Sequence, residues 1–247
     1  MAAMTAPAVY RERIYARYRE THPNAAPPTA AGFAYEARVH EKTFGRLLPA
    51  DRKAKIFEIG CGAGSFLNYL RGAGYRDASG MDQDEGQIAA AGKMGVAGAS
   101  LGDGFAHLAR TPAAYDCVIA IDVVEHLTKD ELFGRLDAVL AALKPGGTFI
   151  WRAPNADGPF FGRVRYGDLT HELAFTKDSA RQLMAVAGFT DVEVFPEEPV
   201  VTGARSLLRA ALWKLFALKA RLYLFAESYA QDSLLTANLI ARARKTS

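Results

Sequence analysis

The feature that most constrains this fold is an alternation of short apolar segments with amphipathic segments between residues 54 and 195. The apolar segments have the length of strands, and the segments between them have helical spacing. Strands that are apolar at nearly every position occur in parallel sheets with helices on both faces. We therefore expect a doubly wound α/β domain, with strands at residues 55–60, 77–82, 97–103, 115–122, 148–154 and 192–195.

An additional segment precedes this core. Residues 8–21 carry Tyr10, Ile14 and Tyr18 at intervals of four, a spacing that predicts a short amphipathic helix. Residues 22–32 contain three prolines and are expected to form a loop. The helix either packs on the main domain or forms a lid over a site.

We expect two parts in the chain. Residues 1–53 form an N-terminal helix and loop, and residues 54–247 form the main domain. Within that domain, residues 197–230 are a helical insertion ahead of a closing strand. The insertion is rich in leucine at helical spacing and carries several basic side chains.

Composition narrows the class of protein. Of the 247 residues, 50% are hydrophobic and 23% are charged, which is typical of a soluble globular protein. A net charge of +3 is too small to indicate nucleic acid as a partner. The two cysteines predict no disulfide framework or metal cluster. The sequence shows no signal peptide and no apolar run long enough to span a membrane, so we expect a cytoplasmic protein.

A glycine-rich turn, "EIGCGAG", follows the first predicted strand. Gly60, Gly62 and Gly64 alternate there, and such a turn lets the backbone approach a ligand closely. A dinucleotide fingerprint would place its third glycine five residues after the first, whereas here the interval is four. Asp82 ends the second predicted strand, where a carboxylate can accept hydrogen bonds from both hydroxyls of a ribose.

Three later segments, "LGDGF", "AIDVVEHL" and "LKPGGTFI", end or begin the following strands. Together with the turn and Asp82, this ordered set resembles class I S-adenosylmethionine-dependent methyltransferases over roughly residues 54–195. The resemblance implies a Rossmann-like sheet, mostly parallel, with an antiparallel last strand. It also implies S-adenosylmethionine as the cofactor.

The same resemblance assigns residues to the cofactor. Three of these assignments have an alternative. Asp103 could be a simple turn residue, and Asp84 could bind the ribose in place of Asp82. Glu58 could accept hydrogen bonds from backbone amides instead of lining the cofactor. The assigned residues are Glu58, Gly60, Cys61, Gly62, Gly64, Asp82, Gln83, Asp103, Gly104, Phe105 and Asp122.

The candidate catalytic residues are His171, His126 and Asp168. His171 and Asp168 lie in "RYGDLTHELAFT", after the fifth strand, where a loop would overhang the reacting methyl. A base positioned there would take the proton of an alcohol acceptor. Structural alternatives are ordinary hydrogen bonds for His171 and a helix-start role for His126.

A metal site is a further alternative. Asp122, Glu125 and His126 resemble an acidic–x–x–Glu–His cluster that some methyltransferases of quinone precursors link to a divalent metal. Relatives without a metal carry the same "EHL", so we expect no metal.

The acceptor is less constrained. "DVVE" stands where relatives that methylate DNA amines carry Asn/Asp-Pro-Pro-aromatic, which disfavours nucleobase amines and nucleic acid. The late helical insertion resembles that of methyltransferases associated with surface polysaccharides. We therefore expect O-methylation of a sugar hydroxyl in a glycan or lipid-linked intermediate. A quinone precursor or another small molecule is the alternative acceptor. Alternatives of another class are an NAD-type oxidoreductase and a noncatalytic cofactor-binding protein.

The insertion also suggests a second partner. Residues 203–226 combine a wide apolar stripe, which Lys219 interrupts, with basic residues and no compensating acid. These basic residues are Arg205, Arg209, Lys214, Lys219 and Arg221. Peripheral contact with an anionic membrane, at the inner face, is one interpretation. A helix packed on the domain with its basic side chains in solvent is the other.

Overall fold

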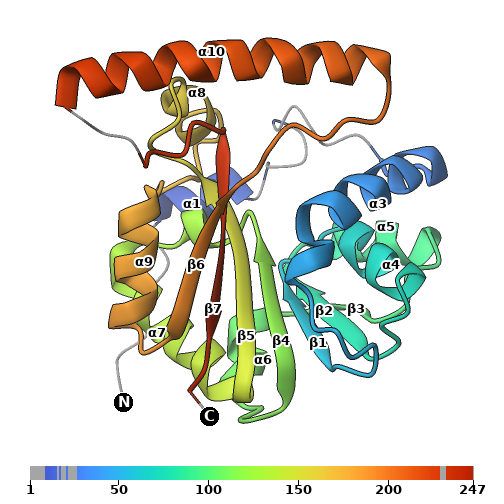
Figure 1. The fold of residues 1–247 in the computed structure, drawn as a ribbon. Coiled ribbons are helices and arrows are strands. Elements are labelled where there is room, and N and C mark those ends of the chain that lie inside the picture. Colours follow the sequence, from blue (N-terminus) through green and yellow to red (C-terminus); the bar gives the residue numbers. More distant parts are fainter. Residues whose placement is uncertain (1–8, 16, 18–20, 22–26, 229–231, 247) are drawn as a thin grey trace.

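The computed structural model describes residues 9–15, 17, 21, 27–228 and 232–246. Its centre is a seven-stranded sheet in the order β3-β2-β1-β4-β5-β7-β6 (Figure 1). β1 through β5 pair in parallel, whereas β7 is antiparallel to both β5 and β6. This arrangement confirms the predicted Rossmann-like methyltransferase fold with an antiparallel last strand. The strands are β1 (Ile56–Ile59), β2 (Ala78–Asp82), β3 (Ala99–Leu101), β4 (Tyr115–Ile121), β5 (Leu143–Pro154), β6 (Thr190–Pro196) and β7 (Asn238–Arg244).

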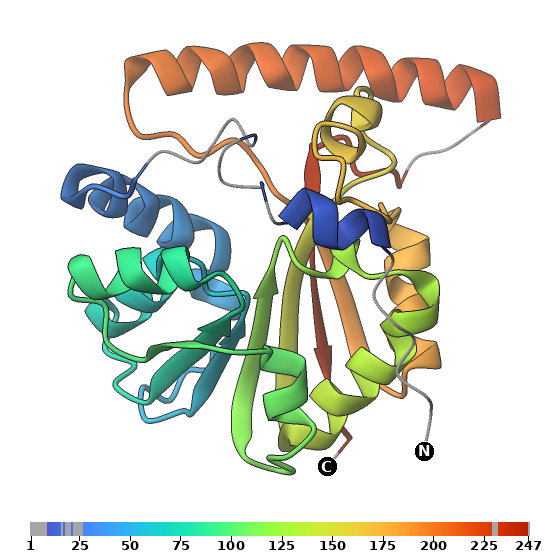
Figure 2. The ribbon, with the colours of Figure 1, turned by 180° about the vertical axis from the view of Figure 1, so that it is seen from behind.

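Helices cover both faces of the sheet (Figures 1 and 2). Along β1 and β4, alternate side chains enter two separate hydrophobic clusters: Ile56 and Ile119 lie in one, Phe57 and Val118 in the other. Burial on both faces explains why these strands are apolar at nearly every position, with Glu58 and Asp116 as the exceptions. The helices are α1 (Val9–Tyr15), α3 (Ala30–Phe44), α4 (Ser65–Gly72), α5 (Glu85–Lys93), α6 (Gly104–Leu108), α7 (Lys129–Ala142), α8 (Phe161–Arg165), α9 (Lys177–Val186) and α10 (Ala204–Ser228), with 3-10 turns η1 (Gly45–Leu47) and η2 (Val124–His126).

The N-terminal region differs in part from the prediction. α1 confirms the start of the helix expected at residues 8–21; of the rest, only residues 17 and 21 are described. The expected loop at residues 22–32 is wrong at its end, because residues 30–32 begin α3. Thr29 caps that helix by accepting a hydrogen bond from Gly32 N–H at 3.0 Å. α3 then buries Phe33 and Phe44, a packing that prolines upstream do not disturb.

The C-terminal insertion forms one long helix, α10, which runs across one end of the molecule with α8 beneath it (Figures 1 and 2). No residue within Ala204–Ser228, all of which the structure describes, is buried. In the described part of the chain, no helix has both the length and the apolar character needed to cross a membrane.

Candidate functional site

The glycine turn after β1 uses its three glycines in different ways. All three have positive φ, at 68° for Gly60, 52° for Gly62 and 82° for Gly64. A Cβ on Gly60 would lie 2.7 Å from a methyl of Val123, and one on Gly64 would lie 2.6 Å from a methyl of Val96. A Cβ on Gly62 would meet nothing within 4 Å. Gly60 and Gly64 therefore permit close packing, and Gly62 borders open space that a ligand could enter.

Asp82 lies directly beside this turn. Its carboxylate accepts hydrogen bonds from Gly62 N–H and from Asp84 N–H, each at 2.8 Å. Asp84 instead caps α5, accepting from Gly86 N–H at 2.7 Å. The geometry therefore favours Asp82 over Asp84 as the ribose carboxylate. Gln83 is exposed between them.

Glu58 is buried under the turn at the end of β1, and its Oε2 has no hydrogen-bond partner among the described residues. Burial raises the pKa of Glu58 to about 8, and the Asp82 carboxylate acts in the same direction. Burial also raises the pKa of the Cys61 thiol, which therefore stays protonated and unreactive. A positively charged ligand beside the turn would stabilise the ionised forms of Glu58 and Asp82.

Asp103 is engaged by protein partners on both oxygens. Its Oδ1 caps α6 by accepting from Phe105 N–H at 2.9 Å, and its Oδ2 pairs with Arg135 at 3.1 Å. Gly104 and Phe105 are buried behind it. These contacts account for Asp103 as a helix cap; a contact with the adenine stays a prediction.

Asp122 follows β4 in a left-handed conformation, with φ of 56°. Both of its carboxylate oxygens pair with Arg152 of β5, which also donates to Glu197 at 2.7 Å. Sequence reasoning missed Arg152 and Glu197, although a lone arginine in the apolar segment "TFIWRAP" was a visible signal. Asp122 is thus a paired carboxylate at the end of the sheet.

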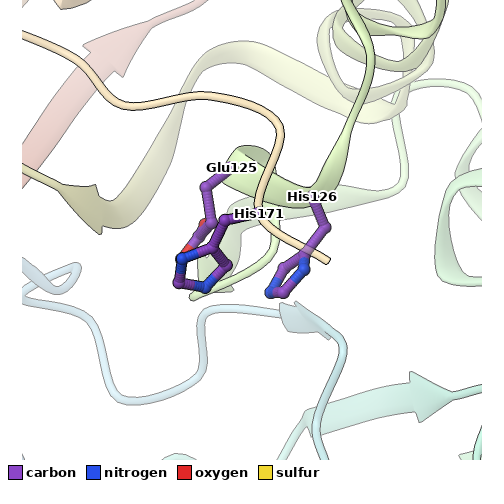
Figure 3. A group of neighbouring side chains, drawn as sticks. All are labelled: Glu125, His126 and His171. Atoms are coloured by element: carbon purple, nitrogen blue, oxygen red, sulfur yellow. The ribbon is translucent and has the colours of Figure 1, made fainter. Parts of the chain in front are cut away.

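The structure brings His126 and His171 together, although they are far apart in the sequence (Figure 3). Their ring centroids lie 4.8 Å apart at an interplanar angle of 68°. Glu125 completes the group: one ligand atom from each of the three side chains lies within 4.8 Å of the others. Among the described residues, these could hold a metal, and the set differs from the Asp122–Glu125–His126 alternative because Asp122 is paired elsewhere.

Hydrogen bonds hold the two segments of this cluster together. Glu172 N–H and Leu173 N–H donate to the carbonyl of Glu125 at 2.7 and 3.0 Å. Arg165 donates to the carbonyls of His171 and Glu172. Together these contacts hold the backbone of the loop after α8 beside η2.

The hydrogen bonds also determine which ring nitrogens carry protons. Thr170, fully buried, donates its hydroxyl proton to Asp168 at 2.6 Å and must therefore accept from His126 Nδ1 at 3.0 Å. His171 Nδ1 lies 3.1 Å from the carbonyl of Val164, which can only accept. Nε2 of each neutral ring is consequently left with a lone pair. Sequence reasoning included Asp168 but missed Thr170, the residue that links it to His126.

Burial controls the charge of this cluster. It lowers the pKa of His126 to about 4, and the neighbouring His171 acts in the same direction. Burial also raises the pKa of Glu125, with a contribution from Asp122. Glu125 Oε2 has no hydrogen-bond partner among the described residues. His126 is therefore neutral at neutral pH and is a weak proton acceptor, and its unprotonated ring nitrogen can bind a metal ion.

Comparison with known proteins places this geometry in a family. Residues 33–194 match the model of a family described as "Methyltransferase domain". No curated protein matches the chain significantly. Among solved structures, an S-adenosylmethionine-dependent methyltransferase from Archaeoglobus fulgidus is 20% identical, with a TM-score of 0.62, over 85% of this chain and 100% of that one.

Two further structures show the same fold. A possible histamine N-methyltransferase from Thermotoga maritima is 18% identical, with a TM-score of 0.56, over 96% of this chain and 95% of that one. Phosphoethanolamine N-methyltransferase 2 from Haemonchus contortus, in complex with S-adenosylmethionine, is 16% identical, with a TM-score of 0.59, over 95% of this chain and 57% of that one. The family match covers well over half of the sequence, and the chain therefore belongs to the methyltransferase domain family.

Proposed function

We propose that this chain is an O-methyltransferase that acts on a sugar hydroxyl of a glycan or lipid-linked intermediate. S-adenosylmethionine is the methyl donor. The open space at Gly62, the Asp82 carboxylate and the buried, unpartnered oxygen of Glu58 fit this cofactor, which carries ribose hydroxyls and positive charge. When bound, it supplies a methyl group that moves to the acceptor oxygen while the carbon–sulfur electron pair stays on sulfur.

The observation that carries the choice of a hydroxyl acceptor is the cluster of Glu125, His126 and His171. A hydroxyl is a weak nucleophile and must lose its proton as the new bond forms. Glu125 and His126 follow β4 in the sequence. Val123, two residues before Glu125, packs against Gly60, so this part of the cluster lies near the glycine turn. Unprotonated ring nitrogens at this place can assist removal of the proton, with Asp168 and Thr170 holding His126 in the required tautomer.

A cavity beneath α10 supports a bulky acceptor. It measures about 530 Å³, and its lining includes the aromatic rings of Tyr35 and Trp213 and the carboxylate of Glu197. Aromatic faces and carboxylates are the groups that bind the faces and hydroxyls of sugars. Glu197 receives a hydrogen bond from Arg152, which pairs with Asp122, so these side-chain contacts link the cavity lining to the end of β4.

The outward face of α10 supports a lipid-linked acceptor and a peripheral place at the inner membrane surface. Along one line of the helix, half-buried side chains such as Ala210, Trp213 and Ala217 face the domain. The exposed large apolar side chains occupy the other side, and basic residues accompany them, with Lys219 among them. The apolar side chains are Leu207, Leu208, Leu212, Leu215, Phe216, Leu218, Leu222, Tyr223 and Phe225.

The experiment that tests this function is mass spectrometry of candidate acceptors after incubation with methyl-labelled S-adenosylmethionine. We expect label on a sugar hydroxyl, and we expect His171→Ala to lower turnover about 10²–10⁴-fold while affinity for S-adenosylhomocysteine is kept. His107→Ala is the control, since His107 bonds to Tyr115 away from the cluster. Equal turnover of wild type and His171→Ala would remove the cluster from the reaction.

A quinone precursor or another small molecule is the second candidate acceptor. A phenol loses its proton more easily than a sugar hydroxyl, so His171→Ala should cost less turnover with a phenolic acceptor. Label on a phenol and not on a sugar would favour this candidate. The absence of any methyl transfer would favour the noncatalytic alternative. The oxidoreductase alternative does not agree with the family match.

A further inference from the structure

Two imidazoles and one carboxylate converge at the end of β4, and this donor set is typical of divalent transition-metal ions such as Zn²⁺ and Mn²⁺. We infer that Glu125, His126 and His171 bind one such ion, which activates the acceptor hydroxyl. This inference rests on the proposed function, because it names how the same cluster assists loss of the proton. It replaces the sequence-based expectation of no metal.

The first support is the state of the two rings. Metal-ligating histidines donate their second ring nitrogen to a neighbouring oxygen, which fixes the tautomer. Here His126 Nδ1 donates to Thr170 and His171 Nδ1 donates to the carbonyl of Val164. Figure 3 shows the two imidazole rings next to each other. In each neutral ring the Nε2 lone pair is thus left for a ligand.

The second support is Glu125. Its side chain is only 1% exposed, yet its Oε2 has no hydrogen-bond partner among the described residues. A buried carboxylate oxygen without a partner is costly, and a bound cation removes that cost. Asp122 cannot serve in its place, because Arg152 already neutralises it.

The spacing of the ligand atoms fits a site that tightens on binding. Ligands about 2.1 Å from one tetrahedral ion lie about 3.4 Å from each other. The three atoms here lie within 4.8 Å of one another, so the most distant pair must approach by up to about 1.4 Å. His171 lies on a loop rather than on the sheet, and a rotation of its ring could supply this movement.

Three protein ligands leave a coordination position open. The ion takes the acceptor hydroxyl there and lowers the pKa of that hydroxyl, whose proton passes to bulk water. The oxygen then attacks the methyl carbon, and the carbon–sulfur electron pair stays on sulfur. The imidazoles act as ligands in this scheme, and they would be proton acceptors without the ion.

The test measures metal directly, on full-length protein without a histidine tag. Chelator-treated protein is dialysed separately against Zn²⁺, Mn²⁺, Co²⁺ and Mg²⁺, and its metal content is determined by mass spectrometry. We expect about one Zn²⁺ or Co²⁺ per chain, visible absorption bands from Co²⁺, and little Mg²⁺, which prefers a shell of oxygens. Binding should weaken at least tenfold in His171→Ala and Glu125→Gln, and about tenfold in Thr170→Val. His107→Ala should bind as wild type does.

Wild type that retains no more metal than His171→Ala would overturn the inference. Because no acceptor is present in this measurement, its result is independent of the proposed function. Methyl transfer by metal-free protein would leave the proposed function intact and make the imidazoles the bases. A bound ion without transfer to any hydroxyl would keep the site and remove the function.

Discussion

At the scale of single residues, the Asp82 carboxylate is held at the end of β2 by two backbone donors, one from the glycine turn and one from its own strand end. Bound ribose hydroxyls would add two charge-assisted hydrogen bonds, each worth roughly 1.5–3 kcal/mol. We expect Asp82→Ala to weaken S-adenosylmethionine binding at least tenfold in calorimetry, and Asp82→Asn to weaken it less. Unchanged affinity of a folded Asp82→Ala would contradict the assignment.

Glu58 makes stability depend on pH. Its pKa is about 8 in the folded chain, above the ordinary value of 4.5, so the folded state binds the extra proton between these values. Its contribution to stability is therefore fully present below pH 4.5 and is lost as the pH rises through 8.

As the pH rises from 6.5 to 8.5, we expect the free energy of unfolding to fall less in Glu58→Gln than in wild type. The two slopes should differ by up to about 1.4 kcal/mol per pH unit. Urea unfolding across this range measures the difference. Glu85→Gln, an exposed carboxyl on α5, is the matched control and should follow wild type. Parallel pH curves for Glu58→Gln and wild type would show that Glu58 is ionised in the fold.

At the scale of elements, α10 combines an outward apolar face with basic side chains. Each basic residue near an anionic surface contributes about 1 kcal/mol, which suffices for reversible attachment. Wild type should co-sediment with anionic vesicles at low salt and be released by high salt. Changing Arg209, Lys214 and Arg221 to Glu should abolish co-sedimentation.

The control for α10 changes three other exposed basic residues, Lys53, Arg76 and Lys93, to Glu. Lys53 and Arg76 precede β1 and β2, at the opposite ends of these strands from the glycine turn and Asp82. This control alters net charge equally and should still bind vesicles. If wild type stays in the supernatant, α10 is a packed cap over the acceptor and the membrane proposal is wrong.

At the scale of the whole molecule, Arg11 connects the N-terminal helix to elements more than a hundred residues away. It pairs with Glu131 of α7 at 2.8 Å and donates to the carbonyl of His126. Arg11 is 9% exposed, so its contacts are shielded from water. α1 thereby lies against the segment that holds the candidate catalytic histidine; whether it acts as a lid or only packs on the domain stays a prediction.

We expect Arg11→Ala to release α1, lower stability by about 1–3 kcal/mol and speed proteolytic cleavage of the N-terminal segment. Turnover should fall, while affinity for the cofactor changes little. Arg13→Ala, an exposed neighbour on the same helix, should behave as wild type. Equal cleavage rates for the two variants would mean that α1 is held by other contacts.

The strands, most helices and the glycine turn were predictable from sequence because they depend on local pattern. Apolar runs indicate strands buried on both faces, and glycines indicate positions with positive φ. Neither inference requires information about residues distant in the sequence. α3 was missed although its alanine, glutamate, arginine and lysine residues favour a helix, and it packs by burying Phe33 and Phe44. β5 begins at Leu143, earlier than the expected residue 148, because Leu143 already pairs with Tyr115 of β4. The register then shifts, and regular pairing resumes where Thr148 meets Cys117.

By itself the sequence determined the fold class, the place of the cofactor turn and the presence of a basic apolar helix. Tertiary structure alone decided which groups meet. In the folded chain Asp122 pairs with Arg152, and Asp103 caps α6. Backbone hydrogen bonds between η2 and the loop after α8 place His171 beside His126. The physical reason is range: periodicity and turn chemistry act over a few residues, whereas hydrogen bonds and charge pairs form wherever folding brings two segments into contact.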